Sequence, residues 1–208
     1  MTQVNVASRK WRDAPGRERR FHYGLLIREV AAEPFFCEDY GVRVWEDGGE
    51  DASVPGITVS AFIRSALEQR TGKRISLWNF KKELKKAMEV LQMDDSYAER
   101  DLNVGFSGGE KKKAEILQML MLEPKLAILD ETDSGLDVDA VRTVSEGVRL
   151  FRERTHGSLL IITHSTRILE ALHVDAAHVM ENGVIVKNGG AELVEAINEK
   201  GFGSLKTE

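Results

Sequence analysis

Apolar residues recur at helical spacing in three stretches of the chain. Residues 58–69 and 80–91 each carry them on one face, and Lys residues fill other positions of the second stretch, which is typical of a solvated face. Residues 108–123 are rich in Leu and Met, which favours a buried helix whose Met side chains fill gaps in the core. The pattern therefore predicts three helices, with a turn at Pro55-Gly56 ahead of the first. The apolar positions of the first two helices are Val59, Phe62, Ile63, Ala66 and Leu67, followed by Phe80, Leu84, Met88 and Leu91.

Two short apolar runs, residues 127–129 and 159–162, are continuous rather than periodic. Helical sequence flanks each of them, and residues 138–154 supply a crossover helix between the two. Because a helical crossover joins parallel strands, we expect a parallel pair covered on both faces. Further along, apolar residues on either side of Glu181-Asn182-Gly183 predict a hairpin, and a helix follows over residues 191–200.

Residues 1–53 lack such periods apart from short pieces such as residues 40–45. Their basic residues are seven Arg and one Lys, against nine Arg and twelve Lys in the remainder. Two interpretations stay open, a surface arm that prefers Arg or a segment with a different coding history. We expect an atypical segment that is poorly ordered or a remnant.

Composition narrows the classes of protein to consider. The chain has 208 residues, of which 42% are hydrophobic and 30% charged, enough for one core and at most a small second lobe. A net charge of -5 gives no overall basic field, so we expect no nucleic-acid partner. No apolar stretch approaches the roughly 20 residues that cross a bilayer, so we expect no direct membrane insertion and a cytoplasmic location. Cys37 is the single cysteine, which excludes an internal disulfide.

Candidate chemistry lies at the ends of the two predicted strands. Asp130 and Glu131 follow the first strand, and ligands collect at strand ends in an open α/β sheet. Adjacent carboxylates can divide the work, one helping to hold Mg²⁺ through water and the other polarising an attacking water. A turn cap is the alternative, and it is favoured for the pair taken alone. His164 follows the second strand, level with the carboxylates if the strands are neighbours, where it could hydrogen-bond a terminal phosphate. A lone His is more often structural, but at this position we favour a functional role. The four remaining His residues show no ligand spacing, so we expect them to be structural or at the surface.

A loop before the third helix offers a second candidate site. Ser107 and Glu110 form a Ser-x-x-Glu capping box, which has a purely structural explanation. A cap needs no glycine, however, whereas Gly108 and Gly109 would leave backbone amides open to a phosphate at the helix N-terminus. We therefore prefer phosphate contact, made to a nucleotide held by another subunit.

These motifs occur in a fixed order that resembles the ABC ATPase superfamily. Within it they are most similar to SufC, the family of ATPases of the SUF iron–sulfur cluster assembly system. The resemblance covers about residue 54 to about residue 203. It rests on residues 55–59, 106–112, 115–118, 122–131, 133–137 and 161–164.

The resemblance implies an α/β fold, an ABC-type ATPase nucleotide-binding domain with a parallel core sheet and an incomplete N-terminal part. Residues 54–105 would form a helical subdomain, and residues 106–208 the signature helix, Walker B strand, His loop, hairpin and last helix. Glu131 and His164 would be catalytic, and Asp130 would bind the metal ion. The nucleotide would be contacted by Ser107, Gly108, Gly109, Glu110, Ser134, Gly135 and Asp137.

The resemblance also implies cofactors and partners. ATP and Mg²⁺ would be the cofactors. SufB-like and SufD-like scaffold proteins would dock near residues 55–95, and the chain would pair with a second copy or with another ABC ATPase subunit.

One family motif is missing from the printed sequence. The Gly-x-x-x-x-Gly-Lys-Ser/Thr loop does not occur, and residues 71–74 lack its first glycine and its final hydroxyl. Because that loop supplies much of the phosphate binding, we expect hydrolysis by this chain alone to be impaired. We interpret the N-terminal portion as truncated or replaced, for instance by a shifted reading frame.

Two other functions stay open. In the first, the chain would be a non-catalytic subunit that completes a partner's nucleotide site. In the second it is the ATPase of an ABC transporter whose spanning part belongs to another chain. Lys111-Lys112-Lys113 and Asp133-Ser134 favour the SUF interpretation over the transporter.

Overall fold

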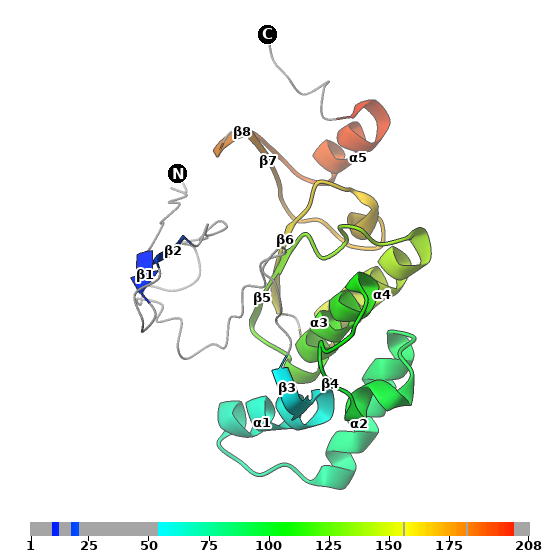
Figure 1. The fold of residues 1–208 in the computed structure, drawn as a ribbon. Coiled ribbons are helices and arrows are strands. Elements are labelled where there is room, and N and C mark those ends of the chain that lie inside the picture. Colours follow the sequence, from blue (N-terminus) through cyan, green and yellow to red (C-terminus); the bar gives the residue numbers. More distant parts are fainter. Residues whose placement is uncertain (1–9, 13–17, 21–53, 156, 182, 202–208) are drawn as a thin grey trace. The chain divides into compact units, whose positions relative to one another are not determined.

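The computed structural model describes residues 10–12, 18–20, 54–155, 157–181 and 183–201 (Figure 1). The chain divides into two compact units, Met1–Asp39 and Tyr40–Glu208. In the first unit, β1 (Lys10–Arg12) pairs with β2 (Glu18–Arg20) in an antiparallel arrangement. Apart from these two strands, the expectation for residues 1–53 lies outside the described residues.

Two helices and a short antiparallel pair form the first part of the second unit. The predicted helices over residues 58–69 and 80–91 are confirmed. Pro55-Gly56, predicted as a turn, lies inside a strand whose register with its partner is irregular. Gly56 bends the backbone there with φ +83° and donates its N–H to Asp101 Oδ2 at 2.9 Å. The elements are β3 (Val54–Thr58), α1 (Val59–Thr71), α2 (Leu77–Val90), the 3₁₀ helix η1 (Asp95–Glu99) and β4 (Asp101–Leu102).

Local chemistry sets the bounds of α1. Thr58 caps its start, because the hydroxyl accepts the N–H of Ala61 at 3.2 Å. Gly72 ends it in the left-handed region at φ +64°, which costs glycine little. The cap and the glycine therefore fix the two ends of the helix. Between them, one face is buried, and Val59 and Ile63 on that face have no exposed surface.

The next elements are a helix, a strand, a helix and a strand in sequence order. Strands β5 and β6 pair in parallel with an unbroken register from Leu126 opposite Ser158 to Asp130 opposite Ile162, which confirms the predicted parallel pair. Helices α3 and α4 lie side by side (Figure 1). The bounds are α3 (Gly108–Leu122), β5 (Leu126–Asp130), α4 (Val138–Thr155), β6 (Ser158–Ile162) and the 3₁₀ helix η2 (Arg167–Leu169).

The described residues bury one face of this strand pair more deeply than the other. That both faces are covered stays a prediction, because residues 13–17 and 21–53 lie outside the described part of the chain. Ala127 and Leu129 are buried in the same cluster as residues of α3 and α4. The alternate residue Ile128 is half-buried, as are residues 159–162 of β6. A continuous apolar run therefore does not fix how deeply a strand is buried, because burial depends on which elements pack against each face.

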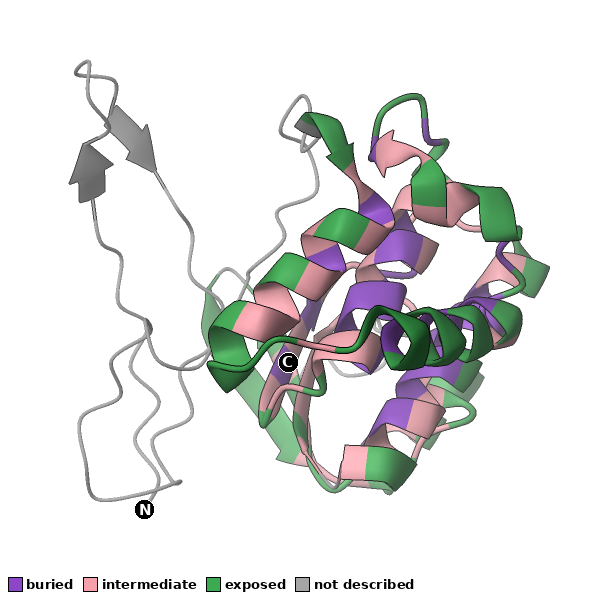
Figure 2. Cartoon of the chain, turned by 90° about the horizontal axis from the view of Figure 1, so that it is seen from below, coloured by how far each residue is buried: buried purple, intermediate pink, exposed green. Residues whose placement is uncertain are grey.

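One cluster of buried side chains joins all four helices from α1 to α4 (Figure 2). Close approach of α4 to its neighbours depends on Gly147, where an added Cβ would lie 2.6 Å from Ile116 Cγ2 and 2.8 Å from Leu91 Cδ2. Phe151 and Val148 fill the cluster from the same helix without exposed surface. Burial of this apolar surface is the main stabilising contribution to the unit.

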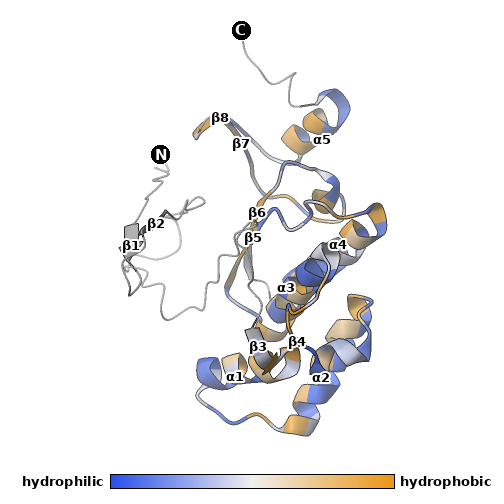
Figure 3. Ribbon diagram, in the orientation of Figure 1, coloured by the Kyte–Doolittle hydropathy of each residue, from blue (hydrophilic) through white to orange (hydrophobic). Residues whose placement is uncertain are grey.

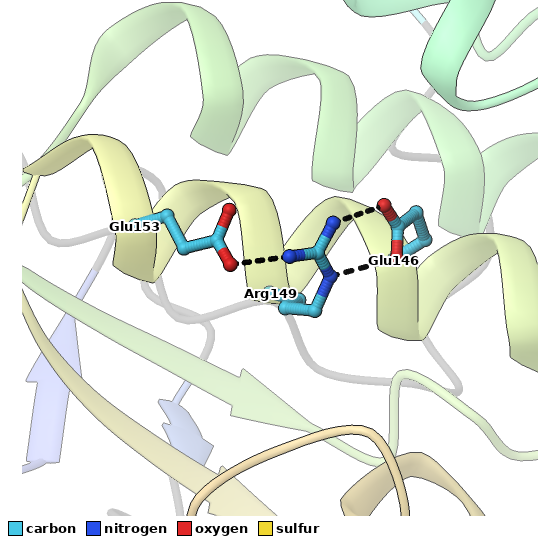
Figure 4. Close-up of polar contacts among 3 residues, drawn as sticks. All are labelled: Glu146, Arg149 and Glu153. Atoms are coloured by element: carbon cyan, nitrogen blue, oxygen red, sulfur yellow. Dashed lines mark hydrogen bonds and ion pairs between the residues drawn. The ribbon is translucent and has the colours of Figure 1, made fainter.

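Hydrophilic residues line much of the solvent-facing side of α2 (Figure 3). The four Lys side chains at positions 81, 82, 85 and 86 of α2 are exposed, which confirms the predicted solvated face. On α4, Arg149 pairs with Glu146, which accepts its Nε–H at 2.9 Å, and with Glu153 one turn further on (Figure 4). Exposed pairs of this kind contribute little stability, on the order of 0–1 kcal/mol each.

The predicted hairpin and last helix are confirmed. Strands β7 (Ala177–Glu181) and β8 (Val184–Gly189) pair antiparallel, and α5 (Ala191–Lys200) follows. Gly183 takes φ +79° in the connecting turn, and Asn182 lies outside the described residues. Within the described ranges, no helix combines the length and the apolar character needed to cross a bilayer.

Candidate functional site

The two strand ends bring Glu131 and His164 together. Nδ1 of His164 lies 3.5 Å from Oε1 of Glu131, and the two side chains keep 66% and 44% of their surface exposed. Their position follows from the parallel register, which puts Asp130 opposite Ile162. The two side chains predicted to be catalytic therefore share one edge of the strand pair, where solvent and a ligand can reach them.

The backbone of Glu131 is held in an uncommon conformation. Its φ is +46°, in the left-handed region that costs a residue with a side chain on the order of 1–3 kcal/mol. Two hydrogen bonds stabilise that conformation: its N–H donates to the carbonyl of Ile162 at 2.8 Å, and its carbonyl accepts the N–H of Ser134 at 3.0 Å. The turn aims the carboxylate along the edge of the strand pair and toward His164.

Asp133 and Thr163 join the loops that follow the two strands. The Thr163 hydroxyl lies 2.9 Å from Oδ1 and 3.0 Å from Oδ2 of Asp133, a carboxylate that is only 6% exposed. The same hydroxyl accepts the N–H of Ser165 at 2.9 Å. This pair was not among the predicted site residues. The available signal was a polar residue directly after the second strand, Thr163, and another in the loop after the first, Asp133.

The loop between β5 and α4 contains three of the predicted nucleotide-binding residues. Ser134 is bonded to the backbone of Glu131, and Gly135 turns the chain with φ +71°. Asp137 caps α4, because its Oδ1 accepts the N–H of Ala140 at 2.7 Å. The loop is thereby fixed at both ends, by the strand edge and by the start of a helix.

Residues 107–110, called the signature corner below, form the start of α3. The predicted capping box is present: the Ser107 N–H donates to Glu110 Oε2 at 2.7 Å, and Ser107 Oγ accepts the Glu110 N–H at 3.3 Å. A Cβ added at Gly108 would meet nothing within 4 Å, and one at Gly109 would lie 3.6 Å from Leu136 Cδ2. Packing among the described residues therefore does not require glycine at 108, and the contact from Gly109 to Leu136 puts the corner beside the 134–137 loop.

A contact from η1 reaches the signature corner and was not predicted. The Tyr97 hydroxyl donates a hydrogen bond to Glu110 Oε1. That bond first, and then the N–H of Ser107, lowers the pKa of the Glu110 carboxyl below its ordinary value. The same bond to Glu110 raises the pKa of Tyr97. The charged carboxylate thus links the first residue of the corner to a different element.

The donor set at the strand edge fits a magnesium ion that nucleotide phosphates help to hold. Among the described residues, no three His, Cys, Asp or Glu side chains cluster as a metal cage. Mg²⁺ commonly binds through one or two carboxylates together with waters and substrate phosphates. Asp130, at the end of β5 and next to Glu131, supplies such a carboxylate.

The two other described His residues, His173 and His178, do not join this site. His173 lies 3.4 Å from Asp175, and His178 Nδ1 lies 2.7 Å from Asn188 across the hairpin. Both are exposed, in keeping with the surface role predicted for them. His22 and His156 lie outside the described residues.

The model of the ABC transporter family matches residues 22–134, more than half of the chain. The chain therefore belongs to the ABC transporter family. The match includes the signature corner and ends just after the first strand edge. It begins earlier than the resemblance near residue 54, within a segment that lies outside the described residues.

Several bacterial proteins are similar in sequence over about three quarters of the chain. "Vegetative protein 296" of Bacillus subtilis (strain 168) is 47% identical over 159 residues, which are 76% of this chain and 60% of that protein. A Streptococcus pyogenes serotype M18 protein named "Probable ABC transporter ATP-binding protein" is 46% identical over 74% of this chain and 60% of its own length. The chain thus spans about 60% of the length of these relatives.

Solved structures confirm the fold. The dimeric structure of MJ0796, described as a bacterial ABC transporter cassette, has a TM-score of 0.58 at 14% identity and covers 67% of this chain and 59% of its own. The same cassette bound to ADP and Pi gives a TM-score of 0.57. At this identity the likeness shows the α/β cassette fold, as predicted, and the dimer and the nucleotide belong to that protein.

Proposed function

We propose that this chain is an ABC-type ATP-binding subunit of a SUF iron–sulfur cluster assembly complex. In this proposal the signature corner and the strand-end groups act on MgATP at a site that a second ABC subunit completes. The observation that carries the proposal is that Glu131, which directly follows Asp130 in the chain, lies close to His164 at an accessible edge of the strand pair.

Each group at that edge has a chemical task in the proposal. Asp130 helps to hold Mg²⁺, which supplies charge stabilisation for the phosphates when bound. The Glu131 carboxylate orients and polarises the attacking water, and His164 donates a hydrogen bond to the terminal phosphate. The 3.5 Å approach of the two side chains supports this division, because water and phosphate must be held next to each other for an in-line attack.

The signature corner serves a nucleotide that a partner holds. Amides at the start of a helix attract anions, and the open space at Gly108 leaves room for a phosphate oxygen. In the printed sequence no Gly-x-x-x-x-Gly-Lys-Ser/Thr loop accompanies these groups. We therefore expect weak nucleotide binding and little turnover by the chain alone, and both to rise in an assembly with an intact homologue. A subunit that only completes the partner's site would raise turnover even when Glu131 is neutralised.

The SUF assignment rests on the amino-acid sequence of the motifs, above all residues 106–112 and 133–137. It implies that SufB-like and SufD-like scaffold proteins dock on the helical region near residues 55–95. The exposed Leu77 and Trp78 at the start of α2 give that region an apolar contact surface.

A transporter ATPase is the second candidate. It is favoured by the names of relatives, such as the "Probable ATP-dependent transporter slr0075" of Synechocystis, which is 44% identical over 73% of this chain. The two candidates differ in the partner: a membrane-spanning subunit for the transporter, and SufB-like and SufD-like scaffold proteins for the SUF assembly.

Two experiments test the proposal. Co-expression of the chain with SufB-like and SufD-like proteins should give a complex that elutes together, whereas recovery with a membrane subunit in their place would contradict the SUF assignment. Titration of ATP into this complex, with and without Mg²⁺, should show binding that is weak but depends on Mg²⁺. No binding under either condition would contradict the assignment of the strand edge as a nucleotide site.

A further inference from the structure

We propose that Tyr97 is a positioning residue that holds the signature corner in the orientation it needs to face a phosphate. Tyr97 lies in η1, and its hydroxyl donates to Oε1 of Glu110 while Oε2 accepts the N–H of Ser107 at 2.7 Å. One carboxylate therefore connects η1 to the first residue of the corner. The phosphate-facing part of this inference rests on the proposed function, whereas the contact within the chain does not.

Arg100 strengthens the same connection from the residue that follows η1. Its guanidinium carbon lies 4.5 Å from the ring centroid of Tyr97 and 4.6 Å from that of Phe106, and its Nη2 donates to the carbonyl of Gly105 at 3.2 Å. The two rings meet edge to face, with centroids 5.1 Å apart. Arg100 and Tyr97 thus contact both the residues just before the corner and the Glu110 carboxylate inside it.

The capping box alone would hold the corner less firmly. Its hydroxyl contact from Ser107 to the Glu110 N–H is 3.3 Å long, and every atom of the box belongs to the corner itself. Tyr97 supplies a contact from another element, and that element is tied to α1 because the Val59 N–H donates to the carbonyl of Arg100 at 3.0 Å. The direction of the amides at Gly108 and Gly109 is therefore coupled to the packing of the helical region.

Tyr97→Phe tests the inference, because it removes the hydroxyl and keeps the ring against Phe106 and Arg100. Asp95→Asn, on the same 3₁₀ helix as Tyr97, is the matched control: it breaks the exposed 2.9 Å ion pair with Lys85 of α2 and leaves the corner untouched. The first readout is amide hydrogen exchange in the purified chain, resolved by NMR. Tyr97→Phe should speed exchange at Ser107 and Glu110 about threefold or more, as expected when a local opening becomes easier. Asp95→Asn should leave it unchanged, and equal protection in the two variants would overturn the inference.

The second readout is ATP turnover by the full assembly. The partner subunit sets the affinity for ATP, so Tyr97→Phe should lower kcat about tenfold and leave KM unchanged. A variant that is only less stable would lose active protein, and a titration of active sites would show that loss. Unchanged kcat would overturn the inference.

Ser107→Ala in the same assay separates this inference from the proposed function. If Ser107→Ala lowers turnover and Tyr97→Phe does not, the inference is wrong and the proposed function stands. If Ser107→Ala keeps full turnover, the corner does not serve the nucleotide. The proposed function of the corner is then wrong, and the phosphate-facing part of the inference falls with it, whatever the exchange rates show.

Discussion

The hydroxyl of Thr163 contacts both carboxylate oxygens of Asp133, at 2.9 Å and 3.0 Å. The contact joins the loop after β5 to the loop after β6. Each loop also carries one of the two proposed catalytic groups, Glu131 in the first and His164 in the second. The hydrogen bond between Thr163 and Asp133 therefore helps to fix the distance between Glu131 and His164, although neither of its two residues is proposed to contact the nucleotide.

Thr163→Val should destabilise the fold, because it keeps the shape of the side chain and leaves the buried Asp133 carboxylate without this donor. A buried polar group that loses its partner costs about 1–3 kcal/mol, and more when it is charged. Denaturant unfolding should show a loss of that size, and Thr163→Ser, which keeps the hydroxyl, should recover most of it. Equal stability of Thr163→Val and the wild type would mean that the contact has no role in holding the loops.

Gly147→Ala should also destabilise the fold, for a steric reason. The new Cβ would lie 2.6 Å from Ile116 and 2.8 Å from Leu91, so α4 must shift away from its neighbours. Overpacking of this kind costs about 1–3 kcal/mol, more than the roughly 0.5–1 kcal/mol that alanine gains over glycine within a helix. Thermal unfolding measures the net effect. A rise in Tm would show that the helices adjust without strain.

Gly108→Ala should leave the stability of the fold intact and lower the turnover of the assembly. Nothing lies within 4 Å of the added Cβ, so stability should stay the same or rise slightly. In the assembly, however, the methyl group would obstruct a phosphate approaching the amide, and turnover should fall about tenfold or more. Unfolding and turnover assays on one preparation check both halves. Full turnover would favour the purely structural interpretation of the signature corner as a helix cap.

Glu110→Gln should lose stability in a pH-dependent way. The Tyr97 hydroxyl first, and then the Ser107 N–H, hold the pKa of Glu110 below its ordinary value of 4.5. A carboxyl with a lowered folded pKa stabilises the fold above its ordinary pKa and loses that contribution as the pH falls through the folded value. The difference in unfolding free energy between wild type and Glu110→Gln should therefore be full at neutral pH and shrink below pH 4.5.

Denaturation curves at several pH values measure that difference. Glu195→Gln, at an exposed position of α5, is the matched control and should show no comparable trend. A difference for Glu110→Gln that stays constant across the acid range would contradict the assignment of the two hydrogen bonds to the ionised carboxylate.

Local pattern predicted much of this fold. The helices of residues 58–69 and 80–91 and the capping box of Ser107 depend on side chains three or four residues apart, so spacing alone identifies them. The meeting of Glu131 and His164 was also predictable, because parallel strands of similar length end at the same edge.

Other features depend on contacts that spacing does not encode. Thr163 and Asp133 are 30 residues apart, and Tyr97 is 13 residues from Glu110, so each pair forms only when separate elements pack. Burial of the strand faces likewise depends on which elements cover them. The strand at Val54–Thr58 was not predicted, because Pro55-Gly56 resembles a turn. Only Val54 and Thr58 pair with β4, and the register between them is irregular.

Glu131→Gln in the assembly with SufB-like and SufD-like partners and an intact homologous ABC subunit is the most direct test of the proposed site. The substitution removes the base and keeps the size of the side chain, so MgATP should still bind while steady-state hydrolysis is lost. The measurement is phosphate release compared with nucleotide binding on the same preparation, with Glu195→Gln as the control. Loss of release with retained binding is the expected result, and full hydrolysis by Glu131→Gln would contradict the role given to the strand-edge carboxylate.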